Sequence, residues 1–262
     1  MARTLFALIL VLAVFAGLGA LGWNFVKDRV QHKPEYRLSA DRISVSPPPE
    51  WVPERFVEEV LQSSGLNRTG SLLDATLPQR LTEAFAAHPW VERVEQVVPR
   101  FPSGADIRLS YRVPAALVEV SQRGIFLVDR NGVLLPPEYL SASDRRNHFL
   151  TIQGIQTMPL GSVGTPWGDP MVQTAAQLAA VLSDVTELLN LARITPIMEE
   201  TPGGARRIVY RLQTAAGTEI HWGTFSPDDP RTEAKIRRLR DLRDQFRSLN
   251  NVPATFRDLS RE

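Results

Sequence analysis

Histidine, cysteine and acidic residues are the side chains that most often bind metal ions or carry out catalysis, and here they form no recognisable motif. The chain has 4 histidines and no cysteine, so a thiol nucleophile and a thiolate metal site are both excluded. His32, His88, His148 and His221 stand alone, without the H-E-x-x-H spacing that places two zinc ligands on one helical face. We expect a capping or surface role for His88, a packing or surface role for His221, and neither a metal nor a cofactor.

Adjacent acidic residues occur at positions 58–59, 199–200 and 228–229. Cleavage of a glycosidic bond needs two carboxylates about 5–9.5 Å apart across a cleft, which sequence neighbours do not provide. The chain also has no G-x-S-x-G nucleophile motif. We therefore expect a non-enzymatic protein. Distant carboxylates could still converge in the fold, so a membrane-anchored cell-envelope hydrolase stays open as an alternative.

The charge balance argues against nucleic acid as a partner. The 30 basic and 29 acidic residues give a net charge of +1, and they are spread along the chain without a basic block. Binding to nucleic acid depends on clustered basic side chains that neutralise phosphates. The composition thus favours protein partners.

One apolar segment, residues 5–26, contains 22 residues without a charged side chain. As a helix with a rise of about 1.5 Å per residue it would be about 33 Å long, enough to cross a hydrocarbon core of about 30 Å. A cleaved signal peptide is the alternative, although its apolar core is usually only about 7–15 residues long. We predict a short cytoplasmic head at residues 1–4, a transmembrane helix at 5–26 and a charged juxtamembrane linker at 27–38.

Residues 39–114 are predicted to form a small domain with the order strand, helix, helix, strand, strand. Residues 43–45 alternate in polarity, and apolar residues then recur at helical spacing in 56–65 and 74–88. In 105–113 apolar and polar residues alternate with period two, which is typical of a half-buried strand. Two helices on one face of a small sheet would bury both apolar stripes.

Residues 115–262 are predicted to form a second, mixed β-rich domain, so the whole chain belongs to the α+β class. Short strands are expected at 116–120, 125–128, 133–135, 149–152, 194–198, 207–212 and 218–222, with long helices at 171–191 and 230–249. Asn131 and Gly132, between apolar runs, give a strong hairpin-turn signal. The last element is expected to be an edge strand at 254–259.

That edge strand is the candidate partner-binding site, formed by Thr255, Phe256, Arg257, Asp258 and Leu259. The edge of a sheet has unpaired backbone N–H and C=O groups, to which a partner segment can add a strand. Alternation would place Phe256 and Asp258 on one face and the other three residues on the opposite face. The alternative, that this strand only closes the sheet, stays open.

Several stretches of the chain resemble a known family. Residues 88–94 (HPWVERV), 99–102 (PRFP) and 107–115 (IRLSYRVPA) resemble the end of a POTRA domain, in the form found in the FtsQ/DivIB family of bacterial cell-division proteins. Residues 125–135 (IFLVDRNGVLL) resemble the next segment of that family. The layout matches along nearly the whole chain, whereas the specific motifs are confined to residues 88–135. The short head, the three prolines at 47–49 and the tail at 256–259 depart from the family pattern.

The resemblance implies a non-enzymatic divisome scaffold. It implies a single-pass protein of the inner membrane at the division septum, with a cytoplasmic N-terminus and an extracytoplasmic (periplasmic) bulk. It also implies FtsL-like and FtsB-like bitopic proteins as partners. The positive-inside count, with Arg3 before the apolar segment and four basic residues soon after it, favours the opposite orientation. We follow the resemblance, and a periplasmic adaptor unrelated to division stays open as a further alternative.

Overall fold

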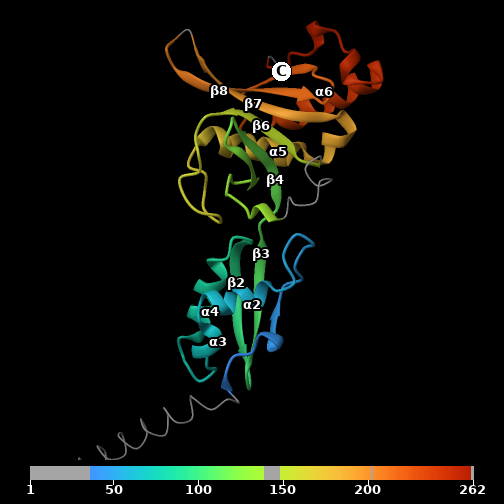
Figure 1. The fold of residues 1–262 in the computed structure, drawn as a ribbon. Coiled ribbons are helices and arrows are strands. Elements are labelled where there is room, and N and C mark those ends of the chain that lie inside the picture. Colours follow the sequence, from blue (N-terminus) through green and yellow to red (C-terminus); the bar gives the residue numbers. More distant parts are fainter. Residues whose placement is uncertain (1–35, 139–147, 202, 261–262) are drawn as a thin grey trace, which may run out of the picture. The chain divides into compact units, whose positions relative to one another are not determined.

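The computed structural model describes residues 36–138, 148–201 and 203–260, which divide after Tyr111 into two compact units (Figure 1). Helices and two sheets, both with parallel and antiparallel pairs, confirm the α+β class. The predicted head, transmembrane helix and most of the juxtamembrane linker lie outside the described residues. In the described ranges, none of the helices combines the length and the apolar character needed to cross a bilayer.

The first unit contains a three-stranded sheet. Its strands are β1 (Ile43–Val45), β2 (Val91–Arg100) and β3 (Gly104–Tyr111), and a 3-10 turn, η2 (Ala40–Arg42), precedes them. The order is β1-β3-β2, with β3 parallel to β1 and antiparallel to β2. Ile107 and Leu109 are buried, as the alternating pattern predicts. The strand ends two residues earlier than expected, and Val113 is 54% exposed.

Three helices connect β1 to β2: α2 (Phe56–Ser63), α3 (Leu66–Thr69) and α4 (Leu77–Ala86). Sequence periodicity predicts α2 and α4 but not the four-residue α3. Gly65, with a φ of 70°, ends α2 and allows the chain to re-enter a helical turn at once. Phe56 and Phe85 meet edge to face, with ring centroids 5.6 Å apart, so α2 and α4 share one buried apolar stripe.

The second unit contains a six-stranded sheet. Its strands are β4 (Pro114–Val120), β5 (Gly124–Asp129), β6 (Leu150–Ile155), β7 (Leu191–Glu200), β8 (Arg206–Thr214) and β9 (Glu219–Gly223). The order is β5-β4-β6-β7-β8-β9. The β4–β6 and β6–β7 pairs are parallel and the other pairs are antiparallel.

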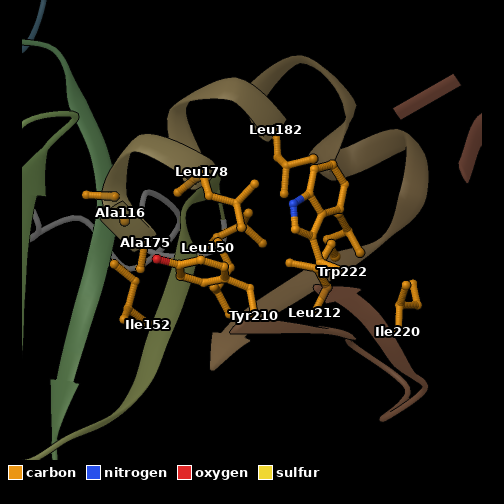
Figure 2. Packing of buried hydrophobic residues seen from close by; sticks show 14 of the residues in the cluster. Ala116, Leu150, Ile152, Ala175, Leu178, Leu182, Tyr210, Leu212, Ile220 and Trp222 are labelled. Atoms are coloured by element: carbon orange, nitrogen blue, oxygen red, sulfur yellow. The ribbon is translucent and has the colours of Figure 1, made fainter. Parts of the chain in front are cut away.

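Helix α5 (Pro170–Leu189) packs against β4, β6, β7 and β8 and contributes the central apolar face of this unit. Figure 2 shows the rings of Tyr210 and Trp222 beside Leu178 and Leu182 of α5. Both rings are at most 1% exposed. The chain then continues through α6 (Arg231–Phe246) and two 3-10 turns, η5 (Leu249–Asn251) and η6 (Ala254–Phe256).

The predicted strand at 133–135 is wrong: these residues form only isolated bridges, Val128 with Leu134 and Val133 with Pro166. The turn before them does form. One carboxylate oxygen of Asp129 accepts hydrogen bonds from the backbone N–H groups of Asn131 (2.8 Å) and Val133 (2.9 Å). The turn is therefore closed by a buried side chain as well as by the backbone.

Candidate partner-docking site

The candidate site lies where the six-stranded sheet ends at β9. Strand β9 pairs with β8 on one side. On its other side lies the terminal segment, which we define as residues 254–260. Among the described residues this segment is joined to β9 by a single parallel bridge between His221 and Asp258. The His221 N–H donates to the Arg257 carbonyl, and the Leu259 N–H donates to the His221 carbonyl, both at 2.8 Å.

The expected edge strand at 255–259 is therefore wrong for most of its length. Thr255 and Phe256 lie in η6, and Arg257 follows it. Their backbone makes local 3-10 hydrogen bonds: the Phe256 N–H donates to Pro253 O (3.0 Å) and the Arg257 N–H donates to Ala254 O (3.2 Å). The Arg257 side chain fixes this turn, since its Nε donates to Val252 O at 2.6 Å. Strand-like pairing is confined to Asp258 and its immediate neighbours, because the residues before them are folded into the η6 turn.

The turn also changes which side chains are accessible. Leu259 is 1% exposed and belongs to the apolar core of the unit. Phe256 is 47% exposed and Asp258 is exposed, whereas Arg257 is half-buried. The sequence placed Phe256 and Asp258 on one face of a strand and Leu259 on the other, but it did not predict which face is exposed. In the structure a turn and one bridge, and not a regular strand, leave Phe256 and Asp258 exposed and bury Leu259.

Gly223, at the end of β9, allows the terminal segment to approach closely. Its φ is +81°, a region that favours glycine, and a Cβ placed on it would lie 2.8 Å from the Cα of Ser260. Sequence reasoning did not select Gly223. A glycine directly after a strand-ending tryptophan was the available signal.

Lys235 of α6 is bonded to the backbone of β9. Its side chain is buried, with only 2% exposure, although it is charged. Its Nζ donates to Trp222 O at 2.7 Å and lies 5.2 Å from the centre of the Trp222 ring. The neighbouring Ile236 is only partly buried. Lys235 lies four residues before Leu239, so helical spacing alone already placed it on the buried face.

Two aromatic rings give this site an accessible apolar surface. Phe246, at the end of α6, and Phe256 in η6 have ring centroids 6.3 Å apart. Phe246 is half-buried and packs against the core, and Phe256 covers it while remaining 47% exposed. Exposed aromatic residues on a rigid base are typical anchors of protein–protein interfaces.

A groove of about 360 Å³ lies between the terminal segment and the outer face of β7, β8 and β9. Its charged lining includes the ion pair of Glu199 with Arg207 (3.1 Å), together with Arg211, His221 and Asp258. Two acidic and two arginine side chains balance when the histidine is neutral. A groove of mixed charge suits a polypeptide segment better than a strongly charged small ligand.

The three histidines that the structure describes do not converge on a metal site. His88 packs edge to face on Phe56. Burial lowers the pKa of His88, and the Glu59 carboxylate, 3.8 Å away, offsets this shift only in part. His148 lies beside Glu187 at an exposed position, and His32 lies outside the described residues. Within 36–138, 148–201 and 203–260, no three histidine or acidic side chains lie close enough to hold a metal ion.

Comparison with known proteins does not assign the chain to a family. No protein-family model matches it, and no curated protein matches it.

Proposed function

We propose that the chain is a non-enzymatic scaffold of the bacterial division machinery, of the FtsQ/DivIB type. One helix, residues 5–26, would anchor it in the inner membrane with a cytoplasmic N-terminus. Its two units would then lie outside the cytoplasm and dock FtsL-like and FtsB-like single-pass proteins. The observation that carries the docking is the edge at β9, where a single bridge joins the terminal segment to the sheet.

The first unit supports the family assignment. Its chain order of strand, helices, strand and strand is compatible with the POTRA-like domain that the resemblance implies, although three helices and not two connect β1 to β2. The motif at 88–94 lies at the entry to β2, and the motif at 107–115 spans the end of β3 and the start of β4. The residues that carry the resemblance therefore belong to the sheets of both units.

The docking chemistry we propose is addition of a partner strand to the outer side of the terminal segment, because the backbone N–H and C=O of His221 at the β9 edge already bond Arg257 and Leu259. Main-chain hydrogen bonds would supply affinity, and side-chain contacts would supply specificity. Phe256 gives such a contact, because its ring is accessible and is held by Phe246 and the η6 turn. The mixed-charge groove beside it can receive the polar side chains of the same partner.

Co-purification of the full chain with the host's FtsL-like and FtsB-like proteins tests this proposal. Phe256→Ala and Asp258→Lys should each weaken capture, Phe256→Ala by about 10–30-fold if the ring is an interface anchor. Leu160→Ala is the matched control, because Leu160 is an exposed apolar residue of the same unit at 84% exposure. Charge reversal at Arg257 is a poor choice, since it would also break the hydrogen bond to Val252 O.

Two results would refute the docking proposal: no capture of either partner by the wild-type chain, or equal capture by the Phe256 and Leu160 variants. Topology and localisation need a separate measurement. A reporter fused after residue 262 should be active in the periplasm and should concentrate at the septum during division. A cytoplasmic signal would overturn the proposed compartment, and an even periplasmic distribution would favour an adaptor unrelated to division.

A further inference from the structure

The turn between β2 and β3 carries an apolar surface that the proposed docking site does not use. We define the hairpin tip as residues 98–104. Phe101 is 67% exposed and Val98 is 43% exposed, and Pro99 and Pro102 are exposed as well. Four accessible apolar residues at one end of a small unit indicate a surface that meets an apolar partner.

The chain enters the first unit directly beside this tip. The Ser39 N–H donates to Ser103 O at 3.2 Å, and Arg42 Nη1 donates to Ser103 Oγ at 2.6 Å. At Gly104 an added Cβ would lie 2.4 Å from Arg42 O, so the two segments are in close backbone contact. The tip is therefore fixed to the point where the preceding chain arrives.

The length of the preceding chain limits how far this entry point can lie from the membrane. The apolar segment ends at Val26, and Leu38 is already tied to the unit through its N–H, which donates to Gly70 O at 3.0 Å. Twelve residues span at most about 40 Å when fully extended, and less in any other conformation. Tyr111, where the chain leaves this unit, is at the far end of β3, about 25 Å from the tip at the usual strand rise. The tip is thus at the end of the unit where the chain that follows the proposed anchor enters.

We propose that the hairpin tip rests on the surface of the bilayer that holds the anchor, with Phe101 inserted at the level of the lipid headgroups. This inference rests on the proposed membrane anchor. Aromatic side chains at the boundary of water and hydrocarbon are favourable because the ring leaves water while the backbone stays hydrated.

The charges around the tip indicate an apolar contact instead of an electrostatic one. Arg100 is paired with Asp106 at 3.4 Å, and Asp41, held by Ser39, lies on the η2 turn next to Arg42. These two arginines and two aspartates balance, whereas attachment to anionic lipids through charge alone usually needs a cluster of about 4–8 basic residues. The contact should therefore depend little on salt or on the fraction of anionic lipid.

One aromatic residue is enough for such a contact because the anchor makes it intramolecular. A short tether gives an effective concentration in the millimolar range, so a contact too weak to recruit a free domain is still populated. The contact would fix the orientation of the first unit on the membrane. This is a role separate from partner capture at β9.

The absence of cysteine gives a direct test. The full chain carrying Val98→Cys, with Phe101 kept, is labelled with an environment-sensitive fluorophore and reconstituted into vesicles of phosphatidylethanolamine and phosphatidylglycerol that contain a headgroup-level quencher lipid. Arg93→Cys is the matched control, because Arg93 is exposed on the same strand, five residues from Val98. Quenching at position 98 should exceed that at position 93 by about twofold or more and should persist from about 0.05 to about 0.5 M salt.

Equal quenching at the two positions, with position 98 open to aqueous iodide, overturns the inference while the vesicles still retain the protein. Protection of position 98 that appears only when an FtsL-like or FtsB-like protein is added also overturns it and identifies a protein contact. Flotation of the vesicles tests the anchor separately. A chain that does not float with the lipid refutes the anchor together with the inference, before any fluorescence is read.

Discussion

Replacing Gly223 by alanine should loosen the terminal segment, and Gly217 provides a control for the backbone strain alone. Both glycines have positive φ, +81° and +90°, and alanine in that region costs about 1–2 kcal/mol. At Gly217 an added Cβ meets nothing within 4 Å, whereas at Gly223 it lies 2.8 Å from the Ser260 backbone. Only the Gly223 variant therefore has to move the terminal segment.

The additional cost can be worked out from what that segment loses. Its two backbone hydrogen bonds to His221 contribute about 0.5–1.5 kcal/mol each. Burial of Leu259 contributes about 1.5–3 kcal/mol. Release of Asp258 and Leu259 returns about 1–2 kcal/mol of backbone conformational entropy for each residue, or about 2–4 kcal/mol together, which offsets much of this loss. We expect Gly223→Ala to destabilise the unit by about 1–2 kcal/mol more than Gly217→Ala does.

Hydrogen–deuterium exchange of the full chain in detergent measures this difference where it arises. Peptides covering 254–260 should exchange about 5–30-fold faster in Gly223→Ala than in Gly217→Ala, which is the factor that 1–2 kcal/mol corresponds to. Melting temperatures should differ by about 2–4 °C for each kcal/mol in a unit of about 150 residues. Identical exchange of these peptides in the two variants would refute the close contact between Gly223 and Ser260.

Two further predictions concern ionisable groups. Asp129→Asn removes the charge opposite Arg112 (2.9 Å, carboxylate 2% exposed) and should destabilise the second unit by about 3 kcal/mol in chemical denaturation. Glu199→Gln, in a pair that is half exposed, should cost less than about 1 kcal/mol, and equal losses would contradict the difference in burial. The first unit should lose stability as the pH falls below 6.5, because burial lowers the pKa of His88 in the fold and the unfolded chain therefore takes up that proton first. Unfolding of wild type and His88→Gln at pH values between about 7 and about 5 checks this: the pH slope should shrink in the variant, and an unchanged slope would rule out His88 as its source.

Elements with strong local patterns could be predicted from the sequence. Alternation identified β3, and helical spacing identified α2, α4 and α6. The turn at Asn131 and Gly132 forms where its residue types predict it, since its geometry depends on glycine and on the adjacent Asp129 carboxylate. Such patterns show which side chains of a short segment face solvent and which face the core, and the segment's own residues contain this information.

The candidate site depended on contacts that no local pattern contains. Residues 255–259 alternate in polarity like a strand. In the structure the first of them form the η6 turn, which the Arg257 side chain stabilises, and Asp258 alone pairs with β9, through the bridge to His221. Helical spacing places Lys235 on the buried face of α6, but the acceptor for its charged group, the Trp222 carbonyl, lies thirteen residues earlier on another element.

The sequence by itself thus determined the α+β class, the positions of most helices and strands, and the absence of a cysteine-based site. Tertiary structure decided the order β5-β4-β6-β7-β8-β9, the approach of the terminal segment to Gly223 and the exposure of Phe256. The physical reason is that periodicity measures the burial of one segment, whereas the partner of that segment is set by pairing and packing between residues far apart in the chain.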